Sequence, residues 1–289
     1  ASCLVGSEMC IRDSYYAYPE GPSAKTGTFG KATYVLSDSL NVPQGYAPFY
    51  ISHYGRHGSR WMPKDDRYVW ICKHFEDESN LTPLGLQVKG MLQRVWENAR
   101  GNGGKLSKLG ALQHQGIAHR MFERYPQIFA AGNAVKARSS VVDRCAKSMQ
   151  AFTSELHTLQ PGLNLDVKTD SADMAWIAYV SPEVKALENR PDVQAQVSPR
   201  RFLLQLFKDV SKVDEPLKLM TEMHTVASSI QDVGLNFSSY PQDIEDGLNA
   251  LFTDDEFCAI YEANNLRMAI NNGTVATNED IPARSAISL

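Results

Sequence analysis

A histidine between two arginines stands out in residues 50–63, YISHYGRHGSRWMP. Arg56 immediately precedes His57, and Arg60 follows it three positions later on a loop that contains glycines. The planar guanidinium of arginine binds two phosphate oxygens at once and keeps its charge at any working pH. Nearby cations lower the pKa of an imidazole, so the ring stays neutral and nucleophilic near neutral pH. This stretch therefore predicts a histidine that attacks phosphorus.

The cationic character extends beyond this loop. Residues 54–73 contain five basic and two acidic side chains, although the whole chain has a net charge of −4. We expect Lys64 and Arg67 to contribute to the rim of an anion-binding site. The further candidates for an extended basic surface are Lys136, Arg144, Arg200 and Arg201. The competing interpretation for all of these residues is an ordinary solvated charge.

Two segments predict β-strands that lead into such side chains. Residues 47–52, APFYIS, are apolar and aromatic, which is typical of a strand buried on both faces, and the loop with His57 follows them. Residues 133–140, NAVKARSS, predict a second short strand that carries Arg138 near its end. Ligands of α/β sheets gather at the carboxyl ends of the strands. We therefore expect Arg138 to converge on one anion with the two arginines of the loop.

The rest of the chain alternates helices and strands and then becomes all-helical. Apolar residues at helical spacing follow Asp65, run through residues 81–100 and recur after Ser107. Residues 163–169 alternate as a strand does. Later signals are helix caps, at Ser181–Pro182, at Ser198–Pro199 and in the capping box Thr253–Glu256. We predict an α/β domain followed by a helical domain.

Composition limits the class of protein. The 289 residues are 43% hydrophobic and 21% charged, which is typical of a globular chain. The slightly negative net charge argues against a dedicated nucleic-acid-binding protein. No run reaches the roughly 18 apolar residues of a membrane-spanning helix, so we predict no membrane span. Beyond residue 14, the cysteines Cys72, Cys145 and Cys258 are too widely spaced for a disulfide framework or a metal site.

Both ends of the chain depart from what we expect of a native protein. Residues 8–13, EMCIRD, back-translate to a transposon-end adapter of DNA sequencing libraries, so we expect residues 1–14 not to be native. The last residues, IPARSAISL, break off in an apolar run without a helix stop signal. We therefore expect truncation at both ends.

Three separated motifs resemble one family of enzymes. They are residues 52–61 (SHYGRHGSRW), 104–121 (GKLSKLGALQHQGIAHRM) and 135–149 (VKARSSVVDRCAKSM). The first resembles the Arg-His-Gly-x-Arg-x-Pro motif of the histidine acid phosphatases, branch 2 of the histidine phosphatase superfamily. Together the three are similar to multiple inositol polyphosphate phosphatases (phytases) of bacterial type. Pro63 comes one residue later than the motif places it, which we interpret as a change to the loop rather than to the chemistry.

The resemblance implies a mechanism and a substrate. It makes His57 the nucleophile that becomes phosphohistidine, and it makes Arg56, Arg60 and Arg138 the clamp on the phosphoryl group. The implied reaction is that of a phosphomonoesterase acting on inositol polyphosphates such as phytate. No metal or other cofactor and no nucleic-acid partner are implied. The implied location is the periplasm or the outside of the cell.

The resemblance also implies a phosphoglycerate-mutase-like fold. This is a three-layer α/β/α domain with an inserted all-helical domain, and here we expect the C-terminal part of the sheet to be missing. The corresponding divisions are a non-native segment at 1–14, an irregular lead-in at 15–46, an incomplete α/β domain at 47–180, the helical domain at 181–275 and the start of a return to the α/β domain at 276–289.

The motif that carries the proton donor in this family is absent. Members carry a second histidine followed by the proton donor, as His-Asp or His-Ala-Glu, and none of the seven histidines here is followed in this way. We therefore expect no proton donor in this chain and only weak activity from it. Two alternatives stay open: a non-catalytic binder of polyphosphorylated ligands, and a phosphoglycerate-mutase-like phosphotransferase. The latter class shares Arg-His-Gly but has no equivalent of Arg60.

Overall fold

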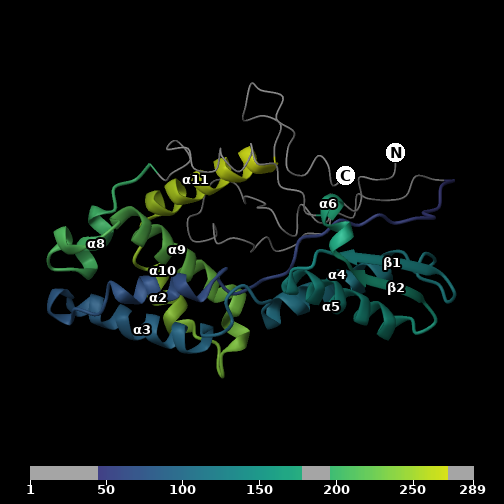
Figure 1. The fold of residues 1–289 in the computed structure, drawn as a ribbon, viewed down its shortest axis with the longest axis horizontal. Helices are drawn as coiled ribbons and strands as arrows, with labels where there is room; N and C mark the ends of the chain where they lie inside the picture. The colour runs from purple at the N-terminus through teal and green to yellow at the C-terminus, as the bar shows by residue number, and fades with distance from the viewer. Residues whose placement is uncertain (1–44, 178–195, 273–289) are drawn as a thin grey trace. The chain divides into compact units, whose positions relative to one another are not determined.

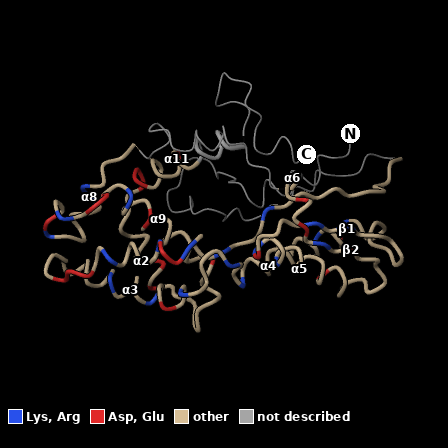
Figure 2. Tube along the Cα trace, in the orientation of Figure 1, with Lys and Arg blue, Asp and Glu red and all other residues tan. Residues whose placement is uncertain are grey.

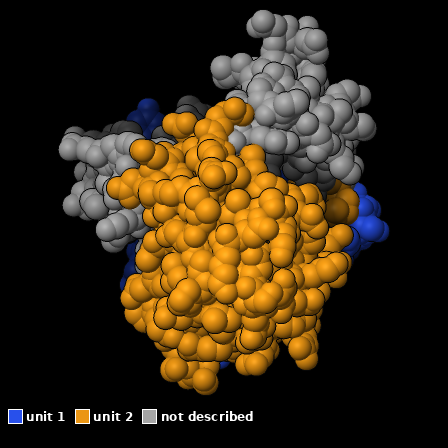
Figure 3. All heavy atoms as spheres, turned by 90° about the vertical axis from the view of Figure 1, so that its left-hand side faces the viewer, with its two compact units in different colours: residues 1–21, 28–60, 106–173 blue, residues 22–27, 61–105, 174–289 orange. Residues whose placement is uncertain are grey.

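The computed structural model describes residues 45–177 and 196–272. These residues divide into two compact units (Figures 1 and 3). Unit 1 contains residues 45–60 and 106–173, and unit 2 contains the other described residues. The predictions that lie outside the described residues are the non-native segment, the lead-in up to residue 44, the cap at Ser181–Pro182 and the return at 276–289.

A strand–helix–strand motif forms the centre of unit 1. Strands β1 (Ala134–Ser139) and β2 (Asn164–Thr169) are parallel, with Ala134 opposite Asn164. Helix α5 (Asp143–Leu159) connects the two strands and packs on both of them. Neighbouring parallel strands require a crossover of this kind, because a tight turn cannot join them. Both strands predicted for this region are confirmed.

Helix α4 (Lys108–Arg124) packs along α5 and completes the described part of unit 1. The hydroxyl of Ser107 caps α4 by accepting the backbone N–H of Gly110 at 3.1 Å. The helix ends two residues before Pro126, which could not continue it. A short 3-10 helix, Ser171–Asp173, follows β2. The buried apolar core of unit 1 consists of Ile117, Ala118, Met121, Tyr125, Phe129, Leu156 and Leu163.

The prediction of a strand at residues 47–52 is wrong. These residues form no strand, and the side chains of Phe49 and Tyr50 are 89% and 70% exposed. Within the part of the chain that the structure describes, only β1 and β2 pair as strands, so 47–52 has no ladder of backbone hydrogen bonds. Aromatic and apolar content indicates a segment that fits a sheet, but burial also requires a neighbouring strand or layer.

Unit 2 is helical. Its α-helices are α2 (Asp65–Lys73), α3 (Pro83–Ala99), α6 (Met174–Ile177), α8 (Arg200–Leu206), α9 (Pro216–Val233), α10 (Gln242–Asn249) and α11 (Asp254–Asn272). Its short 3-10 helices are Glu78–Asn80, Val210–Lys212 and Gly234–Asn236. Helix α9 contacts α2, α8 and α10, and its buried residues Met220 and Met223 lie in the core that these helices share (Figure 1).

The boundary between the units differs from the one predicted at residue 180. Helices α2 and α3 group with the later helices, because α2 packs on α9 while α3 packs on α8 and α10. Tyr68 of α2 and Leu92 of α3 are buried in one core with Leu206 of α8. Helical periodicity shows that a helix has an apolar face, but not which partner covers that face. The three-layer arrangement of the α/β domain stays a prediction.

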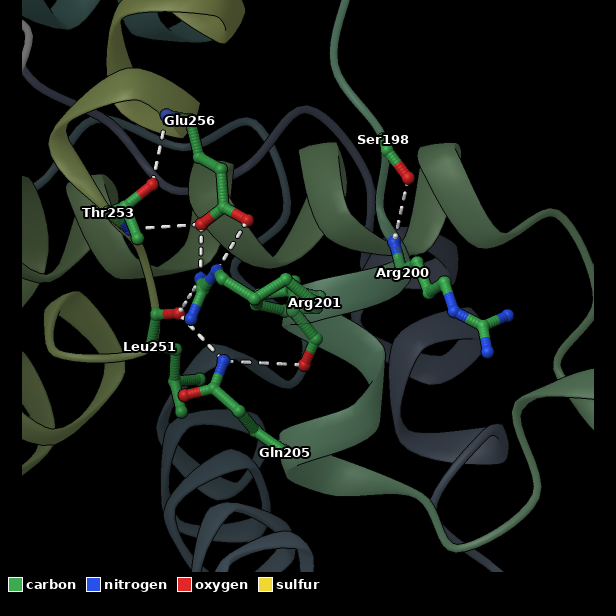
Figure 4. A network of polar contacts seen from close by, with 8 residues as sticks. Ser198, Arg200, Arg201, Gln205, Leu251, Thr253 and Glu256 are labelled. Carbon is green, nitrogen blue, oxygen red and sulfur yellow. Dashed lines mark hydrogen bonds and ion pairs between the residues drawn. The ribbon is translucent and has the colours of Figure 1, made fainter.

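A cluster of polar contacts joins α8 to the start of α11 (Figure 4). The guanidinium of Arg201 donates to both carboxylate oxygens of Glu256 and to the carbonyl oxygen of Leu251. Glu256 also accepts the backbone N–H of Thr253 at 2.9 Å, while the Thr253 hydroxyl accepts the N–H of Glu256 at 3.3 Å. This reciprocal pair is the capping box predicted from the sequence.

Candidate active site

The imidazole of His57 is oriented by its own loop. Its Nδ1 lies 2.8 Å from the carbonyl oxygen of Gly58. A carbonyl oxygen only accepts hydrogen bonds, so Nδ1 carries the proton in this contact. In the neutral ring, the other nitrogen, Nε2, then keeps its lone pair. The geometry therefore leaves the lone pair of Nε2 free of a proton.

The surroundings of His57 keep the ring neutral. Burial is the largest cause of a pKa lowered to about 3, and the charges of Arg56, Arg144 and Arg60 lower it further. The hydrogen bond to Gly58 acts in the opposite direction. The sequence predicted the sign of this shift from the cations alone, whereas desolvation contributes more. At pH values well above 3 the ring is unprotonated, as a nucleophile must be.

Helices α4 and α5 hold the backbone on the C-terminal side of His57. The hydroxyl of Ser148 on α5 accepts the backbone N–H of Gly58 at 3.1 Å. The side-chain oxygen of Gln113 on α4 accepts the N–H of Ser59 at 2.8 Å. The hydroxyl of Ser107 donates to the carbonyl oxygen of Ser59 at 3.0 Å. The loop is thus fixed by side chains that come from two separate helices.

Two glycines allow the loop to approach α4. A Cβ atom on Gly58 would lie 2.3 Å from the carbonyl oxygen of Gly110, and a Cβ on Gly110 would lie 2.2 Å from that of Ser59. Both distances are far below van der Waals contact, so neither position accepts a side chain without movement of backbone. The Arg-His-Gly glycine is therefore required for packing against the first turn of α4.

Arg138 has a different partner from the one predicted. Arg138 lies near the end of β1, as expected. Its guanidinium, however, donates to the Asp166 carboxylate at 2.6 Å and to the Asp166 carbonyl oxygen at 2.7 Å. The bond to this carboxylate raises the pKa of Arg138. The role of Arg138 in the phosphoryl clamp stays a prediction, and its contact with Asp166 argues against that role.

Arg144 is a further arginine whose charge acts on His57. It is the second residue of α5, and its charge lowers the pKa of His57. Its Nε atom is buried and has no hydrogen-bond partner among the described residues. We predicted Arg144 only as a candidate for an extended basic surface, although its position in the first turn of a helix that follows a strand was a signal for anion binding.

The two predicted rim residues belong to unit 2. Lys64 is exposed just before α2, and Arg67 donates from Nε to the Glu222 carboxylate at 2.7 Å. Arg201, another candidate for a basic surface, is bound to Glu256. Figure 2 shows basic and acidic residues interspersed along the described elements rather than separated into regions of one sign. The rim role of Lys64 and Arg67 stays a prediction.

The described residues contain neither a candidate metal-binding cluster nor a candidate membrane-spanning helix. Across 45–177 and 196–272, no three His, Cys, Asp or Glu side chains are grouped so that they could hold a metal ion. None of the helices in these ranges combines the length and the apolar character needed to cross a membrane.

Known proteins provide a comparison at the level of the fold. No protein-family model and no curated protein matches the chain. It is similar to the multiple inositol polyphosphate phosphatase of Bifidobacterium longum solved in complex with inositol hexasulfate, with a TM-score of 0.58 and 14% identity over 96% of this chain and 73% of that one. The same enzyme in complex with phosphate gives a TM-score of 0.56 and 14% identity over 91% and 69% of the two chains. The chain has the fold of the inositol polyphosphate phosphatases.

A phytase shares this phosphatase fold. The phytase from D. castellii matches with a TM-score of 0.53 and 12% identity over 75% of this chain and 50% of that one. The resemblance drawn from the three sequence motifs is thereby confirmed for the fold. At such low identity the roles of individual residues rest on the geometry of this chain.

Proposed function

We propose that the chain is a phosphomonoesterase in which Nε2 of His57 accepts the phosphoryl group of an inositol polyphosphate. The observation that carries this proposal is the contact between His57 Nδ1 and the carbonyl oxygen of Gly58, which leaves Nε2 unprotonated. The lowered pKa of the ring and the nearby arginines support it. Together these features supply a nucleophile and an environment for an anion.

The reaction has two steps. First, the lone pair of Nε2 forms a bond to phosphorus while the ester P–O bond breaks, and the leaving oxygen takes the electron pair and gains a proton from solvent water. Water then attacks the phosphohistidine, the P–N bond breaks, and inorganic phosphate leaves. Phosphoryl transfer depends mainly on positioning and on neutralising charge on the phosphoryl oxygens. In our proposal Arg56, Arg60 and Arg144 provide that neutralisation.

The comparisons and the motifs support the proposed substrate class. The structural neighbours are an inositol polyphosphate phosphatase, solved with inositol hexasulfate and with phosphate, and a phytase. The three sequence motifs resemble the same family. We therefore propose phytate and its partly dephosphorylated products as substrates.

The first experiment measures nitrophenol release from p-nitrophenyl phosphate and phosphate release from phytate. The parent chain is compared with His57→Ala. An alkoxide leaving group needs a proton, whereas nitrophenolate needs it much less, so p-nitrophenyl phosphate tests His57 most directly. We expect nitrophenol release by the parent only, with phytate as a competitive inhibitor of that release. Binding of phytate without any His57-dependent release from either ester would support a non-catalytic binder and overturn the proposal.

A further inference from the structure

The carbonyl oxygen of Ser59 receives two hydrogen bonds from a single residue. The backbone N–H of Ser107 donates to it at 2.9 Å, and the hydroxyl of Ser107 donates to it at 3.0 Å. These two donors match the two lone pairs of a carbonyl oxygen. Only 2% of Ser107 is exposed, so water competes little for either bond.

The peptide group that begins with this carbonyl ends at the backbone nitrogen of Arg60. Arg60 and Leu106 form an isolated antiparallel β-bridge. The bond to the Ser59 carbonyl lies on one side of this bridge. On the other side, the N–H of Trp61 donates to a backbone carbonyl at 3.1 Å. The backbone is thus hydrogen-bonded both before and after Arg60.

The hydroxyl of Ser107 also begins helix α4. It accepts the N–H of Gly110 at 3.1 Å while it donates to the Ser59 carbonyl. One side-chain oxygen therefore connects the first turn of α4 to the residue before Arg60. The cap requires only the acceptor function of this oxygen, whereas the bond to Ser59 uses its proton.

The nucleophile has a different anchor. The N–H of Gly58, next to His57, is accepted by the hydroxyl of Ser148 on α5 at 3.1 Å. Helix α5 therefore holds the peptide after His57, whereas the cap of α4 holds the peptide before Arg60. A substitution at one anchor should disturb one of these two side chains more than the other.

We infer that Ser107 is a positioning residue for Arg60: it fixes the Ser59–Arg60 peptide from the N-cap of α4 and so sets the direction in which the guanidinium approaches the phosphoryl group. This inference rests on the proposed function, which places Arg60 among the arginines that neutralise that group. It also gives a role to the motif at residues 104–121. A displacement of the order of 1 Å in a positioned group costs about 10²-fold in rate, so the loss of this anchor can be measured.

The alternative is that Ser107 only caps a helix. Thr82, at the start of α3, is such a cap: its hydroxyl accepts the N–H of Gly85 and donates to the carbonyl oxygen of Gln205. Those partners belong to unit 2. The carbonyl bonded by Ser107 differs because the next residue in the chain is Arg60. Thr82 therefore offers a matched control, with the same two bonds at a different place.

Three substitutions separate the donated bond from the cap. Ser107→Gly removes the hydroxyl but keeps most of the stability of the cap, because glycine is tolerated at an N-cap. Ser107→Ala removes the hydroxyl and disfavours the cap as well. Ser107→Thr keeps a hydroxyl for both bonds. Thr82→Gly is the control for the loss of a cap hydroxyl that donates elsewhere.

The affinity for inorganic phosphate is the main readout, because it requires no turnover. Calorimetric titration would give Kd for the full chain and each variant, and p-nitrophenyl phosphate would give kcat/KM. We expect Ser107→Gly and Ser107→Ala to weaken phosphate binding roughly tenfold, the scale of one charge-assisted hydrogen bond. We expect kcat/KM to fall about 10- to 100-fold in both. Ser107→Thr and Thr82→Gly should stay close to the parent in both properties.

A double-mutant cycle shows whether the effect passes through Arg60. Arg60→Ala alone should weaken phosphate binding. Adding Ser107→Gly to it should then change Kd little, because the side chain that Ser107 positions is gone. An equal factor from Ser107→Gly in both backgrounds would overturn the inference. So would a folded Ser107→Gly with the parent Kd, or an equal loss of affinity in Thr82→Gly.

The remaining outcomes are also decisive. If neither Ser107→Gly nor Ser107→Ala folds, as judged by circular dichroism, Ser107 is required for stability and the inference is wrong. If the parent does not bind phosphate, or if Arg60→Ala binds it equally well, the arginine clamp of the proposed function is wrong and the inference fails with it. If the parent binds phosphate but releases no nitrophenol, only the proposed catalysis fails. The phosphate Kd values would then still decide whether Ser107 positions Arg60.

Discussion

The hydroxyl of Ser148 connects the nucleophile loop to the turn that carries Arg144. It accepts the N–H of Gly58 at 3.1 Å and donates to the carbonyl oxygen of Arg144 at 2.8 Å. The donor, Gly58, and the acceptor, Arg144, lie 86 positions apart in the chain and are bound by one hydroxyl. The position of the nucleophile and the position of this arginine are therefore coupled through α5.

Ser148→Ala should reduce activity as well as stability. The substitution leaves the N–H of Gly58 without its partner, which costs about 1–3 kcal/mol. We expect roughly a tenfold loss of kcat on p-nitrophenyl phosphate. Thr153→Val is the matched control, because the Thr153 hydroxyl is also buried on α5 but donates only within the helix, to Met149 and Gln150. An equal loss in both variants would show that helix stability, rather than the loop contact, is responsible.

Arg144 and Arg138 can be distinguished by parallel substitutions. If Arg144 contacts the phosphoryl group, Arg144→Ala should lower kcat/KM by about 10²- to 10³-fold, the range for loss of one preorganised donor. Arg144→Lys should retain only part of the parent kcat/KM, because lysine lacks the planar guanidinium that binds two oxygens at once. Arg138→Ala should change kcat/KM by less than about tenfold, since Asp166 already binds that side chain. The opposite ranking would restore Arg138 to the clamp.

The activity should persist into acidic solution. The pKa of His57 is lowered to about 3, so the ring loses its nucleophilic lone pair only when the pH falls to that value. We expect kcat/KM on p-nitrophenyl phosphate, corrected for ionisation of the ester, to show no loss with a midpoint near 6.5. Circular dichroism at each pH verifies that the chain stays folded. A descending acid limb centred near 6.5 would mean that His57 titrates as an ordinary exposed histidine.

The contact between Arg201 and Glu256 should stabilise unit 2. Glu256→Ala removes the capping-box acceptor and leaves Arg201 with only the Leu251 carbonyl oxygen as a partner. We expect a loss of about 1–3 kcal/mol in the free energy of unfolding. Arg201 is 44% exposed in its side chain, so we expect the ion pair itself to add little. All four tryptophans belong to unit 2, so their fluorescence reports its unfolding. Glu262→Ala, an exposed change on α11, is the control. Equal stability of the two variants would contradict this account.

Local patterns were sufficient to predict much of the fold. The strand–helix–strand motif around α5 and the capping box at Thr253 depend on contacts between residues that are close in sequence. The division into units could not be predicted, because α2 and α3 bury their apolar faces against helices more than a hundred residues later. The strand expected at 47–52 failed for a related reason, since strand formation depends on a distant partner.

The site could be predicted in part. The Arg-His-Gly stretch indicated His57 and its neighbouring arginines, because their spacing in the sequence already places them on one loop. The choice between Arg138 and Arg144 depends on Asp166, which lies on the neighbouring strand opposite Lys136 and binds the guanidinium of Arg138 through its side chain.

The formation of phosphohistidine tests the central claim most directly. The full chain would be mixed with ³²P-labelled p-nitrophenyl phosphate, quenched in alkali, which preserves phosphohistidine, and digested to locate the label. We predict label on the peptide that contains His57, and none in His57→Ala. Absence of label from this peptide during nitrophenol release, or undiminished release by His57→Ala, would contradict the account.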